Sequence, residues 1–272
     1  MKLAGCRTLL TGAGSGIGRS LALALAARGA RLVLVGRHAG RLDATVRAII
    51  ASGGDACAIV HDLGDPGGHC SLADATAARL GGIDLLVNNA GISAFGEFAA
   101  ESLSTIDDLV KTNVIAPMLL TRAVLPGMLA AGRGRIVNVG SILGSIGFPH
   151  FAAYSASKFA LRGFSEALRR ELRDTGIGVT YAAPRTTRTA INPDLLYELS
   201  ATGGTAVDEP DDVAALIVDA IAAGRDELYI GWPEKLAVRL NALLPRLIGR
   251  AIAKQAAAAR QRLRAASGLN NV

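Results

Sequence analysis

Thr11-Gly12-Ala13-Gly14-Ser15-Gly16-Ile17-Gly18 is the stretch that decides the fold of this 272-residue chain. An apolar strand is predicted directly before it, at Thr8–Thr11, and an Ala/Leu-rich helix follows it to Arg28, with Gly29 as the stop. A second apolar strand is predicted at Arg31–Val35. A strand, a glycine loop, a helix and a strand within about 30 residues form the βαβ unit that binds a dinucleotide.

The glycines of this loop have a physical purpose. Residues without a Cβ let the backbone turn sharply and approach a pyrophosphate, which then lies on the free N–H groups at the start of the helix. The residues expected to contact the cofactor are Gly12, Ser15, Gly16, Ile17 and Gly18.

The end of the second strand indicates the type of cofactor. An acid there would accept hydrogen bonds from the ribose hydroxyls and repel a 2′-phosphate. This chain has Gly36-Arg37 instead, with Arg19 nearby after the glycine loop. The guanidinium favours NADP(H) over NAD(H). The alternative is that Arg37 only caps a strand at the surface.

The same alternation continues along the chain. Helices are predicted at 42–52, 72–80, 104–129, 151–173 and 211–223, and strands at 56–60, 83–87, 135–139, 178–182 and 227–230. Seven strands alternating with helices predict an α/β fold with one Rossmann-type, doubly wound, mainly parallel sheet and helices on both faces. We expect this catalytic domain to occupy residues 1–232, followed by a basic amphipathic helical extension over 233–272.

Ligands of such sheets bind outside the carboxyl ends of the strands. Several polar or glycine-rich segments fall at these ends, and we expect them to meet in one crevice: Gly12–Gly18, Arg37, Asp62, Asn88–Gly91, Ser141 and Pro184.

Tyr154 and Lys158 are four residues apart in a helix-prone run, so their side chains are expected on one face. A phenol has a pKa of about 10, and a neighbouring ammonium lowers it toward a useful range. The alternative is a solvated pair on an exposed helix face.

Together these residues resemble the short-chain dehydrogenase/reductase family in its compact form, over roughly residues 5–232. Thr11–Gly18 is similar to the cofactor loop of that family, and Asn88-Asn89-Ala90-Gly91 to its sheet-stabilising motif. Its catalytic tetrad is matched by Asn113, Ser141, Tyr154 and Lys158. The resemblance implies nicotinamide-dependent hydride transfer between an alcohol and a carbonyl, in a homodimer or homotetramer.

The resemblance also implies a role for each member of the tetrad. Ser141 would donate a hydrogen bond to the substrate carbonyl oxygen, and Tyr154 would give that oxygen its proton. Lys158 would hold the cofactor ribose and, with the oxidised nicotinamide, lower the tyrosine pKa. Asn113 would position a water that links Lys158 to solvent; the alternative is that it satisfies its own helix.

Further contacts to the cofactor are implied in the same way. Asp62 would bond the adenine with Leu63 beneath the ring, and Asn88 would be structural, bonding backbone across strands. The other implied cofactor contacts are Asn89, Ala90, Gly91, Pro184, Thr187 and Thr189.

The chain departs from the family after the sixth strand, where Arg185 stands in place of a glycine. Arg185 and Arg188 are interpreted either as a clamp for an anionic substrate group or cofactor phosphate, or as solvent-facing arginines whose backbone still adopts the required turn.

The substrate is expected under 93–98, 142–151 and 186–207, with Gly203-Gly204 as the hinge of a lid. Apolar side chains beside the catalytic pair favour a lipid-like, steroid-like or acyl carbonyl substrate: Ile142, Leu143, Ile146, Phe148 and Phe151. His150 is either a further polar contact or a loop residue.

The charge is unevenly placed. From Glu234 to Val272 eight Lys and Arg stand against one acid, a net +7, so residues 1–233 carry −1 of the total of +6. The near-neutral body argues against nucleic-acid binding. Cys6, Cys57 and Cys70 have no metal or disulfide spacing, and no secretory signal or apolar run of spanning length is recognised, so a cytoplasmic location is expected.

Apolar residues recur at three- and four-residue spacing from Leu236 to Ile252, with basic residues between them and Pro245 as a predicted break. This extension is expected either to bind an anionic membrane surface or to dock on protein. The rival hypotheses for the whole chain are an NAD-dependent alcohol dehydrogenase and a noncatalytic nucleotide-binding scaffold.

Overall fold

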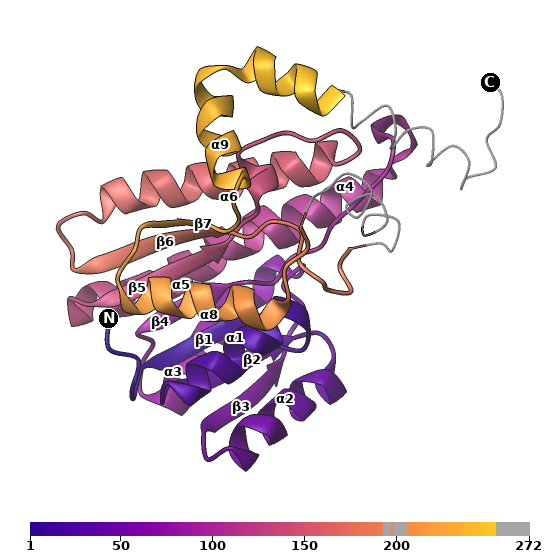
Figure 1. Ribbon diagram of the computed structural model, residues 1–272. Helices are drawn as coiled ribbons and strands as arrows, with labels where there is room; N and C mark the ends of the chain where they lie inside the picture. Colours follow the sequence, from indigo (N-terminus) through magenta and orange to yellow (C-terminus); the bar gives the residue numbers. More distant parts are fainter. Residues whose placement is uncertain (193–196, 198–205, 254–272) are drawn as a thin grey trace.

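A single parallel sheet forms the centre of the computed structural model, which describes residues 1–192, 197 and 206–253 (Figure 1). The strand order is β3-β2-β1-β4-β5-β6-β7, and every neighbouring pair is parallel. The strands are β1 (Arg7–Thr11), β2 (Arg31–Gly36), β3 (Asp55–Val60), β4 (Leu85–Asn88), β5 (Gly134–Val139), β6 (Ile177–Ala183) and β7 (Glu227–Tyr229).

Helices cover both faces of this sheet (Figure 1). One face carries α1 (Gly16–Ala27), α2 (Ala39–Ala51) and α8 (Pro210–Ala222). The other carries α3 (His69–Leu80), α4 (Leu103–Val110), α5 (Ala116–Ala131) and α6 (Ala152–Glu171). Short 3-10 turns lie at Pro66–Gly68, Phe98–Ala100 and Ile142–Gly144. The predicted doubly wound α/β fold is confirmed.

Alternating side chains build the two cores. Leu10 and Leu34 pack with α1 and α8, whereas their neighbours Leu9 and Val33 pack with α3 and α5. All four are fully buried. Successive strand residues point to opposite faces, so a strand covered on both sides must be apolar at nearly every position.

The predicted helix at 104–129 is not uniform. It consists of α4, a π-helical turn at Lys111–Ile115 and α5. The continuous run Leu103–Ala131 is long and apolar enough to cross a membrane by length and composition alone, which the sequence analysis did not recognise. Its contacts with α3 and α6 place it among the helices of the domain.

The described part of the C-terminal extension, residues 233–253, packs on the body. α9 (Glu234–Leu243) is followed by a break at Leu244 and a further helix at 245–253, so the predicted interruption at Pro245 is confirmed. Val238 packs with Ile142, Ile146 and Tyr181 in a third apolar cluster. The predicted hinge Gly203-Gly204 and the extension after residue 253 lie outside the described residues.

Candidate active site

One cavity of about 980 Å³ lies at the carboxyl ends of the strands, around the switch point between β1 and β4. Every residue predicted to bind the cofactor lines it, as do Ser141, Tyr154 and Lys158. Asn113 is buried and is not among the lining residues. The crevice predicted from the strand ends therefore exists.

The glycine positions of the cofactor loop have no room for a side chain. A Cβ on Gly18 would lie 2.0 Å from the carbonyl oxygen of Gly12, and one on Gly16 would lie 2.9 Å from Thr189. Gly12 and Gly16 also have positive φ angles of 69° and 50°. The loop is a tight backbone turn whose N–H groups precede α1, as a dinucleotide phosphate requires.

The end of β4 is tied to this loop. The Thr11 hydroxyl accepts hydrogen bonds from the backbone N–H groups of Asn89 and Ala90, both at 3.0 Å. The Asn89 amide in turn donates to the Thr11 carbonyl at 3.0 Å and to the Gly12 carbonyl at 3.4 Å. Asn89 thus supports the loop from the neighbouring strand while lining the cavity.

Two arginines line the cavity beyond β2. Arg37 does so as predicted, but Arg19 is not among the lining residues. Arg41 takes that place, with its Cβ packed toward the position that a Gly14 side chain would occupy. It was missed because α2 begins at Ala39, three residues before the predicted start, which puts Arg41 in the first turn.

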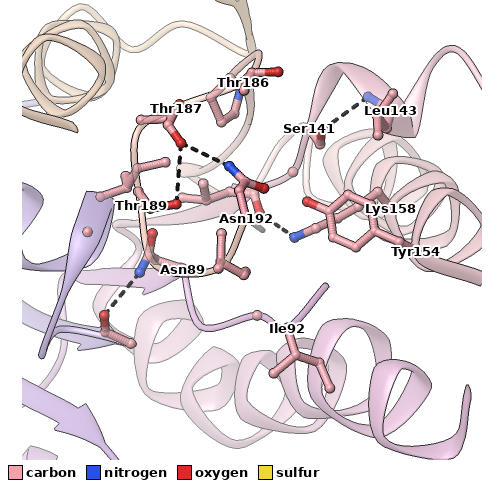
Figure 2. A pocket seen from close by; sticks show the side chains of 18 of the residues that line it. Asn89, Ile92, Ser141, Leu143, Tyr154, Lys158, Thr186, Thr187, Thr189 and Asn192 are labelled. Atoms are coloured by element: carbon pink, nitrogen blue, oxygen red, sulfur yellow. Dashed lines mark hydrogen bonds between the residues drawn. The ribbon is translucent and has the colours of Figure 1, made fainter. Parts of the chain in front are cut away.

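Ser141, Tyr154 and Lys158 lie together where β5 ends and α6 begins (Figure 2). The Lys158 ammonium is 5.7 Å from the centre of the Tyr154 ring and donates to the Val139 carbonyl at 3.2 Å. Lys158 is only 4 % exposed. The solvated pair considered as an alternative is thus excluded.

Burial shifts both groups toward their neutral forms. It raises the pKa of Tyr154 to about 12, against a smaller lowering by a hydrogen bond with the Ser141 side chain. It lowers the pKa of Lys158 to about 8. The lowered tyrosine pKa expected from the spacing is not what the protein alone produces, because desolvation of the phenol raises its pKa by more than the hydrogen bond with Ser141 lowers it. A protonated phenol is the form that a proton donor needs.

The Ser141 hydroxyl is oriented by its own chain. It accepts a hydrogen bond from the Leu143 N–H at 3.1 Å, so the hydroxyl hydrogen points to another acceptor on the cavity side, where Tyr154 lies. The Tyr181 hydroxyl accepts from the Ser141 N–H at 3.4 Å and donates to its carbonyl at 3.1 Å.

Tyr181 fills space that two glycines leave open. A Cβ on Gly140 or Gly144 would lie 2.2 Å from its ring or 2.4 Å from its hydroxyl oxygen, respectively. The sequence analysis missed Tyr181, because an aromatic residue in a strand is normally core and nothing in the pattern indicated this contact.

Asn113 lies in the π-helical turn and is 1 % exposed. Its amide donates to the Ile92 carbonyl at 2.9 Å and to the Ser157 hydroxyl at 3.0 Å, while its oxygen accepts from the Ile92 N–H at 2.9 Å. The side chain thus ties the segment after β4 to α6. The water relay stays a prediction.

Asn88 is structural, but its partners differ from those expected. Its amide donates to the side chains of Asn138 at 2.9 Å and Thr121 at 3.3 Å, not to strand backbone. The Asn138 amide continues to Ser165 at 2.8 Å. A buried polar chain therefore joins β4, β5 and α6 behind the site.

Arg185 and Arg188 are engaged within the protein. Arg185 makes two hydrogen bonds to Asp208, at 2.7 and 2.9 Å, and one to Glu234 at 3.1 Å. Arg188 pairs with Glu209 at 2.9 Å and lies over the Tyr197 ring. These contacts argue against the clamp. Arg188 is solvent-facing, with its side chain 59 % exposed, but the solvent-facing interpretation is wrong for Arg185, whose side chain is 16 % exposed and connects the segment after β6 to the start of α9.

The apolar end of the cavity has two walls. Ile142, Leu143, Ile146, Phe148 and Phe151 line it as predicted. The other wall was not predicted and comes from the extension, through Ala237, Ile248, Ala251 and Ile252.

His150 has a positive φ of 67° and packs edge-on against Phe95, but it is not among the described residues that line the cavity. It behaves as a loop residue rather than as the further polar contact.

The protein groups fit a dinucleotide. The narrow glycine turn, the Asp62 carboxylate after β3 and the buried Lys158 all line the same cavity. Asp62 accepts from the Gly64 N–H at 2.9 Å through one oxygen, which leaves the other available. Across the described ranges, no group of three or more His, Cys, Asp or Glu is arranged to hold a metal ion.

Comparison with known proteins agrees with this geometry. The family model described as short chain dehydrogenase matches residues 7–198. The chain belongs to the short-chain dehydrogenase/reductase family. The ketoacyl reductase HetN of Nostoc sp. is 38 % identical over 229 residues, which cover 84 % of this chain and 79 % of HetN.

Two solved members of the family have the same fold. A metagenomic short-chain oxidoreductase in complex with NADP is 34 % identical, with a TM-score of 0.73, over 85 % of this chain and 98 % of that one. A short-chain dehydrogenase/reductase from Burkholderia phymatum in complex with NAD is 28 % identical, with a TM-score of 0.82, over 91 % and 96 %. Neighbours of this short-chain dehydrogenase/reductase thus include structures with either cofactor.

Proposed function

We propose that this short-chain dehydrogenase/reductase is an NADPH-dependent reductase of an apolar carbonyl substrate, an acyl ketone above all. The observation that carries the proposal is the grouping of Ser141, Tyr154 and Lys158 at one cavity whose far side holds Arg37 and Arg41. The similarity to a ketoacyl reductase supports the acyl class.

The residues would divide the chemistry between them. The bound nicotinamide supplies the hydride that the carbonyl carbon receives. Tyr154 gives its proton to the carbonyl oxygen, so that hydride and proton together make the alcohol. The Ser141 hydroxyl, whose oxygen accepts from the Leu143 N–H, donates to the same oxygen and stabilises its developing negative charge. Lys158 holds the ribose hydroxyls and returns a proton toward Tyr154.

The proposed preference for NADPH over NADH rests on the residues at and after the end of β2. Gly36 provides no carboxylate to bind a ribose 2′-hydroxyl, and the exposed guanidinium groups of Arg37 and Arg41 suit a 2′-phosphate. The proposed protein works as a homodimer or homotetramer. Its proposed location is the cytoplasm, where reducing conditions suit three free thiols.

The experiment is steady-state oxidation of NADPH and of NADH by the purified full-length chain, with β-ketoacyl thioesters, steroids and short ketones as substrates. We expect turnover of one apolar class and a higher kcat/KM for NADPH. In Arg37→Asp and Arg41→Ala that preference falls by roughly 10- to 100-fold, because charge-assisted contacts to phosphate are lost.

Arg47→Ala is the matched control, since Arg47 is exposed on α2 and is not among the residues that line the cavity. A preference for NADH in the unaltered chain would overturn the cofactor assignment. Cofactor binding without turnover of any carbonyl would favour the scaffold hypothesis.

A further inference from the structure

The C-terminal helices have two faces of different character. On α9, the residues Ala237, Val238 and Asn241 turn toward the body, where Val238 is buried and the Asn241 amide donates to the Ser145 carbonyl at 3.0 Å. Leu236 and Leu243, seven residues and two turns apart, share the opposite face with Arg239. The helix at 245–253 likewise turns Ile248, Ala251 and Ile252 toward the cavity.

The outer face is rich in exposed apolar side chains. Large apolar residues between 232 and 247 keep much of their surface in water: Trp232 72 %, Leu236 43 %, Leu243 78 %, Leu244 52 % and Leu247 57 %. Within the described residues none of them is needed to close a core. Such a concentration is typical of a docking surface.

The charges on this face all have one sign. Lys235, Arg239, Arg246 and Arg250 are exposed and make no ion pair within the described part of the chain. The single acid, Glu234, is held by Arg185 with its side chain 18 % exposed. Beyond residue 253 the sequence adds Lys254, Arg260, Arg262 and Arg264 and no acid.

We propose that the outer face of residues 232–253 docks on an anionic lipid bilayer. Exposed leucines and a tryptophan among unpaired cations match the apolar interior and the negative surface of such a bilayer. The charge argues against a second copy of the chain, because a two-fold contact of this face with itself would bring like charges together. The face is separate from the catalytic residues, so the proposal does not depend on the proposed reaction.

Docking through this face would place the substrate cavity close to the bilayer. The same two helices form one wall of the cavity through Ala237, Ile248, Ala251 and Ile252. When the outer face lies on a bilayer, these helices lie between the lipid and the apolar end of the cavity, so an apolar substrate held in the bilayer is close to its site.

The test is co-sedimentation of the full-length chain with vesicles of phosphatidylcholine alone and with phosphatidylserine added. We expect binding to the anionic vesicles, weakened by high salt. The double variant Leu243→Asp/Leu247→Asp should bind at least roughly tenfold more weakly, as should Arg246→Gln/Arg250→Gln. Neither pair lines the cavity, so NADPH binding should be unchanged and shows that both variants are folded.

Leu103→Asp and Arg173→Gln are the matched controls, since Leu103 is 85 % exposed on α4 and Arg173 is exposed beyond α6. Both should bind vesicles as the unaltered chain does. No sedimentation with anionic vesicles, or an equal loss in the controls, would overturn the proposal. So would vesicle-independent self-association that the Leu243→Asp/Leu247→Asp change abolishes, because the face would then be a contact between copies.

Discussion

At the scale of single residues, Lys158 is the titrating group that matters near neutral pH. Burial lowers its pKa to about 8, whereas Tyr154 stays protonated to about 12. The ammonium is therefore the form present below pH 8 and is lost as the pH rises through that value. A reductase that needs this charge to hold the cofactor should lose activity on that alkaline side.

We predict that kcat/KM for carbonyl reduction falls above a pH of about 8. In Lys158→Arg, whatever activity remains should persist to higher pH, because a guanidinium stays charged. Pairs of pH profiles for the two proteins check this. A profile of the unaltered protein that is flat to a pH of about 10 would show that the lysine charge is not required.

Tyr181 is predicted to position Ser141. In Tyr181→Phe the ring still fills the space beside Gly140 and Gly144, but Ser141 loses both main-chain hydrogen bonds to the hydroxyl. At about 0.5–1.5 kcal/mol for each bond, we expect kcat to fall roughly tenfold while KM for NADPH is unchanged.

The control for this variant is Tyr229→Phe. The Tyr229 hydroxyl accepts from the Ser145 hydroxyl at 3.4 Å and makes no hydrogen bond with Ser141 in the described part of the chain. Steady-state kinetics of the two variants distinguish a positioning role of the Tyr181 hydroxyl from a packing role of its ring. Equal kcat values for both would mean that Tyr181 has only a packing role.

At the scale of elements, Arg185 joins the segment after β6 to α9. The side chains of Arg185, Asp208 and Glu234 are 16 %, 16 % and 18 % exposed. Removing the guanidinium in Arg185→Ala leaves two largely buried carboxylates without their partner. We predict a loss of about 1–3 kcal/mol in the free energy of unfolding. We also predict a higher KM for the carbonyl substrate, because α9 forms part of the wall of the cavity that would bind it.

Arg188→Ala is the comparison for that experiment. The Arg188–Glu209 pair is 59 % and 57 % exposed, so its loss should cost under about 1 kcal/mol. Denaturant unfolding of both variants measures the difference. If Arg185→Ala is no less stable than Arg188→Ala, the contacts of Arg185 do not hold the extension in place.

At the scale of the whole molecule, the sheet and the crevice could be predicted because their signals are local. The glycine loop, the alternation of strands and helices and the Tyr154–Lys158 spacing each lie within a few residues or repeat regularly. The convergence of distant segments then follows from parallel strands, whose carboxyl ends share one edge.

The features that could not be predicted depend on long-range contacts. Asp208 and Glu234 are 23 and 49 residues from Arg185, and no local pattern pairs them with it. The π-helical turn at Lys111–Ile115 could not be predicted from the spacing of apolar residues along the chain. The direction of the Tyr154 pKa shift depends on how deeply the folded chain buries the ring, which spacing alone does not give.

The most direct test of the catalytic proposal is single-turnover reduction of the best carbonyl substrate by Tyr154→Phe, beside a fluorescence titration of NADPH. We predict that NADPH binds within about twofold of the unaltered protein, while the rate of the chemical step falls by roughly 10²- to 10⁴-fold, because the proton donor is gone. Retained reduction by Tyr154→Phe would contradict the assignment of Tyr154 as the group that protonates the substrate oxygen.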